Sequence, residues 1–272
     1  MIIDTHVHHG CMGPFYMPDE MVSEMISKYN IDHIILSNCL SCERDEELNL
    51  LPKNFSSTQC DSLRQSLNFA RSHPGRVSVM PWIKPVTEGL TEDLIKLTED
   101  NLDLVKGIKF HAHNSKLRSD AKELEPYYEL AAKYNFPVAI HTGGVNEAHV
   151  KYVLNAAKNH PDVNFILVHM GLGTDNTEAI RCMDEVPNIY GDTTWVSIES
   201  TLEAIKRCGD DRIVFGTDSP IDGLDTYAFN KAGERSLYQQ YFNEFKDMVS
   251  KETYEKIMYK NAIKLFNLTN FM

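Results

Sequence analysis

The sequence predicts a single-domain α/β protein, a (β/α)8 barrel of the TIM type that spans residues 1–272. First, short apolar runs alternate with longer amphipathic stretches along the whole chain, which is the rhythm of βα units around a parallel sheet. Second, eight such units in 272 residues match the usual size of this barrel. Third, no linker rich in Pro, Gly or Ser divides the chain, so one domain is expected.

The expected strands are short and apolar, and each has the length of a barrel strand. They lie at residues 2–8, 33–38, 77–82, 105–111, 137–141, 163–169, 188–192 and 213–217. The intervening segments carry helical spacing, as in Leu124, Tyr127, Tyr128 and Ala131, and several end before a proline such as Pro137. Two long polar segments, 39–60 after the second strand and 218–231 after the eighth, are expected to be loops that cover the active-site end.

Composition narrows the classes of partner. Lys and Arg number 27 against 39 Asp and Glu, and a net charge of −12 would repel nucleic acid and anionic lipid surfaces. No apolar run approaches the ~18 residues that span a bilayer, and the N-terminal residues read as a core strand and not as a cleavable leader. We therefore expect a soluble, cytoplasmic protein with neither a nucleic-acid nor a membrane partner.

Six cysteines are too few for a disulfide scaffold in a chain of this length. The segment Cys39-Leu40-Ser41-Cys42 has no second pair to complete a zinc ribbon. We interpret these cysteines as ordinary thiols at a strand end, with an active-site contact or redox role as the alternative.

Histidines and one aspartate stand at the carboxyl ends of four expected strands. His6 and His8 lie two apart on the first strand and so point to the same face, while His141, His169 and Asp218 end the fifth, sixth and eighth strands. A single histidine after an apolar run is more often a hydrogen-bonded core residue, but strand ends of a TIM barrel meet at one rim. The set predicts a metal site, and imidazole with carboxylate suits Zn²⁺, although Fe²⁺, Mn²⁺ or Co²⁺ could use the same ligands.

These motifs, taken in order, resemble those of the amidohydrolase superfamily. They are Asp4-x-His6-x-His8, Gly107-Ile108-Lys109-Phe110-His111, His141-Thr142-Gly143, His169-Met170-Gly171, Gly216-Thr217-Asp218-Ser219-Pro220 and the closing segment 257–268 with Asn261-Ala262. The nearest branch resembles the amidohydrolase-related group that includes aminocarboxymuconate semialdehyde decarboxylase. The resemblance covers nearly the whole chain, but membership in such a family says little about substrate.

The resemblance implies that His6, His8, His141 and Asp218 bind one divalent metal ion, most simply Zn²⁺. It implies that His169 is a catalytic acid or base, and Asp218 could transfer a proton as well as bind the ion. If two ions are present, His169 would instead become a ligand.

Lys109 has three alternative roles. It could be carboxylated and bridge two ions, as in the binuclear branch of the superfamily, bind a substrate carboxylate or developing anion as an ammonium, or form a structural ion pair with Asp4. His111 could line the same pocket and bind substrate if its strand continues, whereas His113 is expected to be a loop residue.

Aromatic and sulfur-containing residues in or after strand ends could either wall the pocket or cap the barrel core. They are Phe15, Tyr16, Met17, Trp82 and Trp195.

The leading functional hypothesis is a hydrolase that uses a metal-activated water on an amide, lactone, ester or related bond of a small molecule. Nonoxidative decarboxylation of an aromatic or unsaturated acid is the close alternative. A TatD-type deoxyribonuclease is disfavoured by Lys109, by Thr142 and Gly143 after the fifth strand, and by the acidic charge. A non-catalytic metal-binding protein would have lost an essential group, yet all the candidate groups are present. Assembly into a homo-oligomer is left open.

Overall fold

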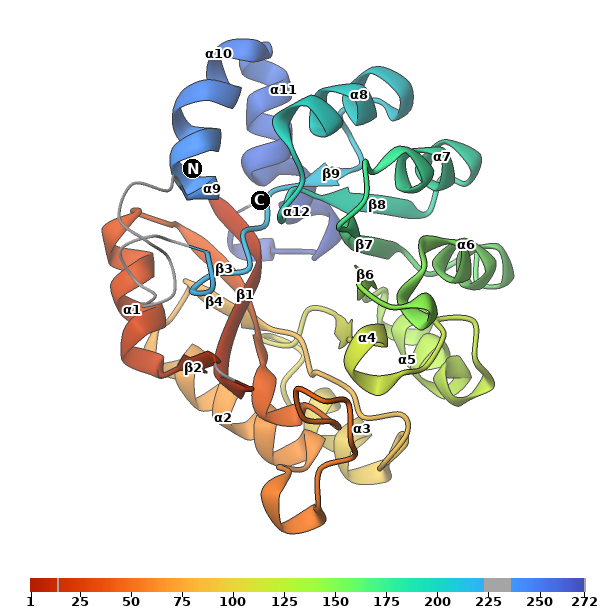
Figure 1. The fold of residues 1–272 in the computed structure, drawn as a ribbon. Helices are drawn as coiled ribbons and strands as arrows, with labels where there is room; N and C mark the ends of the chain where they lie inside the picture. The colour runs from red at the N-terminus through yellow and green to blue at the C-terminus, as the bar shows by residue number, and fades with distance from the viewer. Residues whose placement is uncertain (14, 223–235, 272) are drawn as a thin grey trace.

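The computed structural model describes residues 1–271 apart from residue 14 and residues 223–235. Parallel strands occupy the centre and helices α1 to α8 lie around them, as Figure 1 shows. The parallel strands are β1 (Ile3–Met12), β3 (His33–Asn38), β4 (Val77–Val79), β5 (Ile108–Phe110), β6 (Val138–Gly143), β7 (Phe165–Leu172), β8 (Ile189–Asp192) and β9 (Ile213–Val214). Each falls within or overlaps one of the eight expected ranges.

The strands form two sheets that meet at two seams. One sheet has the order β2-β1-β3-β4 and the other β5-β6-β7-β8-β9. Isolated parallel bridges across the seams pair Val79 with Val105, Trp82 with Lys109, and Val7 with Ser219. At the seam between β9 and β1, the His8 amide donates to the Ser219 carbonyl at 2.8 Å and the Asp218 amide to the His6 carbonyl at 2.9 Å. These contacts bring the carboxyl ends of the first and last strands together.

The helices are α1 (Asp19–Lys28), α2 (Gln59–Ser72), α3 (Glu92–Glu99), α4 (Ala112–Ser115), α5 (Glu125–Tyr134), α6 (Val150–Asn159), α7 (Thr177–Glu185), α8 (Ile198–Cys208), α9 (Leu237–Gln239), α10 (Lys246–Met248), α11 (Lys251–Glu255) and α12 (Asn261–Leu265). Helices α1 to α9 and α12 each carry buried residues, whereas the short helices α10 and α11 carry none. Thr58, Thr91 and Ser197 cap α2, α3 and α8 by accepting a hydrogen bond from a first-turn amide. In the described part of the chain, no helix has the length and apolar character needed to cross a membrane.

Two strands differ from the sequence-based expectation. β1 runs on to Met12 and pairs antiparallel with a short strand, β2 (Phe15–Met17), which was not predicted. The expected strand 105–111 is shorter, because β5 ends at Phe110 and the chain turns into α4 with His111 as its N-cap. His113 therefore lies in a short helix and not in a loop.

The two expected loops differ in how much of each is described. Residues between β3 and α2 are largely irregular apart from the 3₁₀ turns Cys39–Ser41 and Lys53–Phe55. Cys39 and Cys42 are buried there beside Met17 and Trp82, and burial raises the pKa of both thiols, as expected of ordinary unreactive cysteines. Of the expected loop 218–231, residues 223–231 lie outside the described residues.

Candidate metal centre

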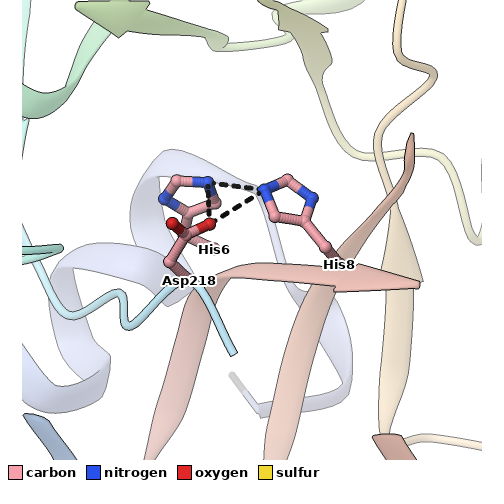
Figure 2. Close-up of side chains that lie close together, drawn as sticks. All are labelled: His6, His8 and Asp218. Carbon is pink, nitrogen blue, oxygen red and sulfur yellow. Dashed lines mark hydrogen bonds and ion pairs between the residues drawn. The ribbon is translucent and has the colours of Figure 1, made fainter. Parts of the chain in front are cut away.

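His6, His8 and Asp218 converge at the carboxyl ends of the strands, as Figure 2 shows. The Nε2 atoms of His6 and His8 are 2.9 Å apart. Asp218 Oδ1 lies 3.1 Å from His8 Nε2 and 3.4 Å from His6 Nε2. Strand alternation places the two imidazoles on one face of β1, and the seam hydrogen bonds bring Asp218 to them.

The other ring nitrogen of each imidazole is held by an acceptor. His6 Nδ1 donates to Asp192 Oδ2 at 3.1 Å, and His8 Nδ1 lies 3.3 Å from the Ser37 carbonyl oxygen and 2.9 Å from its hydroxyl. With the proton on Nδ1, both Nε2 lone pairs face each other and the Asp218 carboxylate. The Lys109 amine, 2.9 Å from His6 Nε2, supplies one donor beside them. The His8 lone pair and the Asp218 carboxylate still repel each other at 3.1 Å unless a cation lies between them. The donor set therefore fits a divalent metal ion.

Protonation of these groups favours the same conclusion. Burial lowers the pKa of both imidazoles, so both are neutral at pH 7. Although burial acts to raise the pKa of the Asp218 carboxyl, this pKa lies well below its usual value, so the group is a carboxylate. Neutral imidazoles and a charged carboxylate are the forms that bind metal ions.

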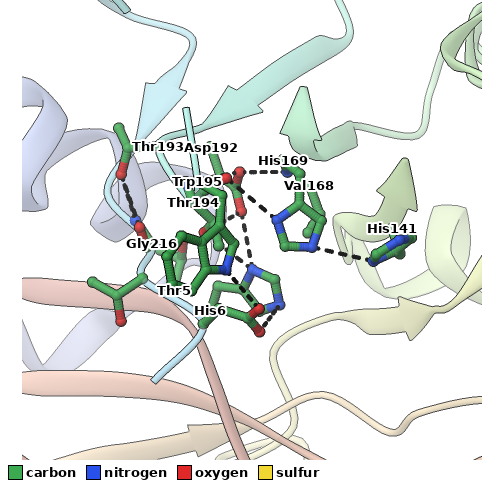
Figure 3. Close-up of polar contacts among 12 residues, drawn as sticks. Thr5, His6, His141, Val168, His169, Asp192, Thr193, Thr194, Trp195 and Gly216 are labelled. Carbon is green, nitrogen blue, oxygen red and sulfur yellow. Dashed lines mark hydrogen bonds and ion pairs between the residues drawn. The ribbon is translucent and has the colours of Figure 1, made fainter. Parts of the chain in front are cut away.

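His141 and His169 form a second pair of imidazoles beside this cluster, as Figure 3 shows. His169 Nδ1 lies 3.3 Å from the Thr194 carbonyl oxygen, which can only accept, so its Nε2 accepts from His141 Nδ1 at 3.1 Å. His141 Nε2 is then left with a lone pair. It is buried and has no hydrogen-bond partner among the described residues. His141 lies outside the close triad of ligand atoms, but this nitrogen is free to bind an added group.

Asp192 is a site residue that the sequence analysis missed. Its Oδ2 accepts from His6 Nδ1 at 3.1 Å and from the Thr194 hydroxyl at 2.8 Å, and its Oδ1 accepts from the amides of His169 at 2.8 Å and Thr194 at 3.2 Å. One carboxylate thus orients both a candidate ligand and the candidate acid or base. The signal was available, because Asp192 ends the expected strand 188–192 as Asp218 follows the eighth.

Lys109 is fully buried with its Nζ 2.9 Å from His6 Nε2. Burial lowers the pKa of this amine to about 8, although the Asp218 and Asp192 carboxylates oppose the shift. The expected alternative of an ion pair with Asp4 is not formed among the described residues. Asp4 instead accepts hydrogen bonds from the hydroxyls of Thr217 at 2.6 Å and Tyr238 at 2.5 Å.

A cavity of about 280 Å³ opens over the triad. It is lined by His6, His8, Met12, Phe15, Lys109, His111, His141, His169, Leu172, Trp195, Asp218 and Ile221. Of the aromatic and sulfur-containing residues singled out from the sequence, Phe15 and Trp195 line it and Tyr16 is 69% exposed. Met17 and Trp82 are buried in a cluster against which Phe15 packs.

Three residues of the site have left-handed backbone conformations that side chains rarely adopt. The φ angles are +67° at His169, +55° at Trp195 and +69° at Asp218. The Trp195 indole N–H donates to Asp218 Oδ2 at 2.9 Å, which leaves Oδ1 for the imidazoles. Unfavourable backbone conformations of this kind cluster at functional sites, where the surrounding structure maintains them.

A family model described as amidohydrolase matches residues 63–268. The chain belongs to the amidohydrolase family. This confirms the resemblance inferred from the motifs, and the family is a family of metal-dependent enzymes. No curated protein sequence matches the chain closely enough to count as a relative.

Solved structures with the same fold share little sequence with this amidohydrolase. 5-Carboxyvanillate decarboxylase from Sphingomonas paucimobilis has 12% identity and a TM-score of 0.71, with 98% of each chain covered. An uncharacterised TIM-barrel protein from Bordetella bronchiseptica has 18% identity and a TM-score of 0.66, again with 98% of each chain covered. A dihydroxybenzoic acid decarboxylase from Polaromonas with bound manganese has 14% identity and a TM-score of 0.65, with 98% of this chain and 97% of that chain covered. At such identities the likeness shows the fold alone, and it confirms the TIM barrel.

Proposed function

We propose that this amidohydrolase is a metal-dependent hydrolase that acts on an amide, lactone, ester or related bond of a small molecule. The observation that carries the proposal is the convergence of two imidazole lone pairs and a charged carboxylate on the floor of a cavity. A divalent ion bound there would supply a Lewis acid and an acidified water, and Zn²⁺ suits the nitrogen and oxygen donors.

The residues divide into holding and proton-transfer roles. His6, His8 and Asp218 would hold the ion, with His141 Nε2 as the fourth donor. Asp218 and His169 would move protons, because both line the cavity and both are held in place by a hydrogen bond. Asp218 accepts from the Trp195 indole, and His169 donates to the Thr194 carbonyl.

A second candidate, nonoxidative decarboxylation of an aromatic or unsaturated acid, is favoured by the cavity walls. Phe15 and Trp195 offer flat surfaces for a planar substrate, and the Lys109 amine lies at the floor as a group that could bind a carboxylate. The two reactions differ in their products, since hydrolysis incorporates an oxygen atom from water and decarboxylation releases carbon dioxide.

The test begins with metal content. Purified protein is analysed for bound metals, stripped with a chelator, and reloaded separately with Zn²⁺, Mn²⁺, Co²⁺ or Fe²⁺. A panel of amides, lactones, esters and aromatic acids is then assayed in ¹⁸O-labelled water for label uptake and for carbon dioxide. We expect activity to disappear on chelation and return with one of the metals. Full activity in metal-free protein would refute the proposal.

Whether the site would hold one ion or two depends on the role of Lys109. Its Nζ lies so close to His6 Nε2 that a cation at the triad would face an ammonium a few ångströms away, and carboxylation would replace this repulsion by attraction. If Lys109 is a carboxylated bridge, Lys109→Ala lowers the metal count per chain. If it is a substrate-binding ammonium, the variant keeps its metal and its KM rises.

A further inference from the structure

His111 caps helix α4 with its ring. Its Nδ1 accepts a hydrogen bond from the Asn114 backbone amide at 3.1 Å. A backbone amide can only donate, so Nδ1 must carry the lone pair. In the neutral imidazole the proton is therefore on Nε2.

The ring cannot readily turn to another arrangement. It is stacked between Trp82, at a centroid distance of 4.9 Å and an interplanar angle of 14°, and His141, at 4.0 Å and 14°. A half-turn of the ring would place a carbon where Nδ1 is now and leave the Asn114 amide without this acceptor. Packing and the cap together fix both the ring orientation and the tautomer.

His111 differs in this respect from the other imidazoles of the site. His6, His8 and His169 each direct Nδ1 at an acceptor, and His141 directs its Nδ1 at the His169 lone pair. Those four rings carry the proton on Nδ1. The stacked pair on the cavity wall thus presents an N–H from His111 beside a lone pair from His141.

The His111 ring borders two adjoining cavities. His111 lines both the 280 Å³ cavity over the triad and an adjoining one of about 330 Å³. Within the described part of the chain, no hydrogen bond to His111 Nε2 is formed, whereas Nδ1 is used by the cap. Of the residues lining the triad cavity, Lys109 is engaged with His6 and Trp195 with Asp218.

We propose that His111 is a substrate-binding residue whose Nε2–H, held in one tautomer by the Asn114 amide, donates to a carbonyl or carboxylate oxygen of the substrate. The inference rests on the proposed function in that the substrate occupies this cavity. It specifies the substrate class further: a small molecule whose acceptor oxygen lies next to a flat group that can stack between the aromatic walls.

The tautomer is tested first, by long-range ¹H–¹⁵N NMR on histidine-labelled protein. The His111 signals are assigned by their loss in His111→Gln. We expect the proton on Nε2. His33 is the internal reference, because its Nδ1 lies 3.0 Å from the Gly75 carbonyl and must carry the proton. A His111 ring protonated on Nδ1, or exchanging between tautomers, overturns the proposal.

Donation to an acceptor is tested with benzoate as the probe, in protein reloaded with zinc and in protein as purified. His111→Phe keeps a flat ring without the N–H and should bind benzoate roughly tenfold or more weakly, the usual effect of losing a hydrogen bond to a charged acceptor. His111→Gln, which keeps an N–H donor, should recover part of the loss. His73→Phe, directly after α2 and outside the lining of both cavities, is the control and should bind as wild type does.

Two outcomes contradict the proposal: wild-type protein that binds no benzoate, and a His111→Phe variant that binds it as tightly as wild type. The outcome is separable from that of the proposed function. Benzoate binding that depends on His111, in a protein that hydrolyses nothing on the panel, would sustain this inference while the hydrolase proposal falls.

Discussion

Replacing Asp192 by Asn should weaken metal binding although Asp192 is not itself a candidate ligand. Each carboxylate oxygen accepts two hydrogen bonds, so the NH₂ group of Asn must face two donors in either orientation. On the Oδ1 side these are the backbone amides of His169 and Thr194, which cannot rotate away. On the Oδ2 side they are the Thr194 hydroxyl, which can rotate, and His6 Nδ1. The amide should therefore turn its NH₂ toward His6.

The magnitude follows from that orientation. Burial raises the pKa of Asp192 to about 7, so the assay is run above that pH, where Asp192 is charged. There His6 loses a hydrogen bond to a charged acceptor, a contribution of about 1.5–3 kcal/mol, and its ring is no longer held with Nε2 toward the triad. Loss of such an outer partner of a metal-binding histidine typically costs about 10–100-fold in metal affinity. We expect a loss in that range for Zn²⁺, with the number of ions per chain unchanged.

The assay is competition for Zn²⁺ against a chromophoric chelator, with urea unfolding measured in parallel. Asp210→Asn is the matched control, because Asp210 is a hydrogen-bonded carboxylate outside the triad. Its Oδ1 accepts a hydrogen bond from Lys256 Nζ at 2.8 Å. This variant should affect stability without changing metal affinity. Asp192→Asn that binds Zn²⁺ as tightly as wild type would refute the orientation argument, and equal losses in both variants would show that general destabilisation is the cause.

Three further outcomes are expected. Burial lowers the pKa of His33 to about 4 from the 6.5 of an unfolded chain, so between these pH values the unfolded state binds a proton that the folded state excludes. About 3 kcal/mol of stability should therefore be lost as the pH falls from 6.5 to 4. Urea unfolding of His33→Gln at several pH values should lack this dependence on pH. Gly143→Ala should destabilise far more than Gly75→Ala, although both have positive φ, because a Cβ at Gly143 would lie 2.3 Å from a backbone nitrogen of β7 and one at Gly75 meets nothing within 4 Å; similar losses in thermal unfolding would disprove the steric reason. Trp195→Phe removes the indole donor to Asp218 while keeping a ring, and chelator competition should show metal affinity reduced by up to about tenfold; unchanged affinity would mean that the indole does not position the carboxylate.

The eight strands could be predicted because each is a short apolar run bounded by polar or turn residues. The prediction of the barrel needed only the alternation of these runs with amphipathic segments. Strand β2 could not, because three residues paired only to the end of β1 carry no period of their own. The end of β5 was misplaced because His111 follows the apolar run in sequence but adopts the backbone of a helix cap. A cap made by histidine is not one of the usual N-cap signals.

The triad followed from strand ends, and the convergence of His6, His8 and Asp218 needed only the rule that parallel strands end at one rim. The contacts that orient it could not be predicted, since they depend on which side chains meet across neighbouring strands. The pairing of His6 with Asp192, of Lys109 with His6 and of Trp195 with Asp218 each joins different strands or loops. The histidine tautomers are harder still to predict from the sequence, because each depends on a single carbonyl or amide partner.

Because the candidate ligands come from both sides of the seam between β9 and β1, the metal site forms only when these two strands have paired. The backbone hydrogen bond from Thr5 to Phe215 joins residues 210 positions apart, and the candidate ligands lie on either side of it. Closing so long a loop is entropically costly and brings its contacts only when both strands are in place. An ion that binds only the closed ring at a concentration 1,000 times its Kd would stabilise it by about 4 kcal/mol. The concentration of metal would then affect the stability of the folded barrel as well as its activity.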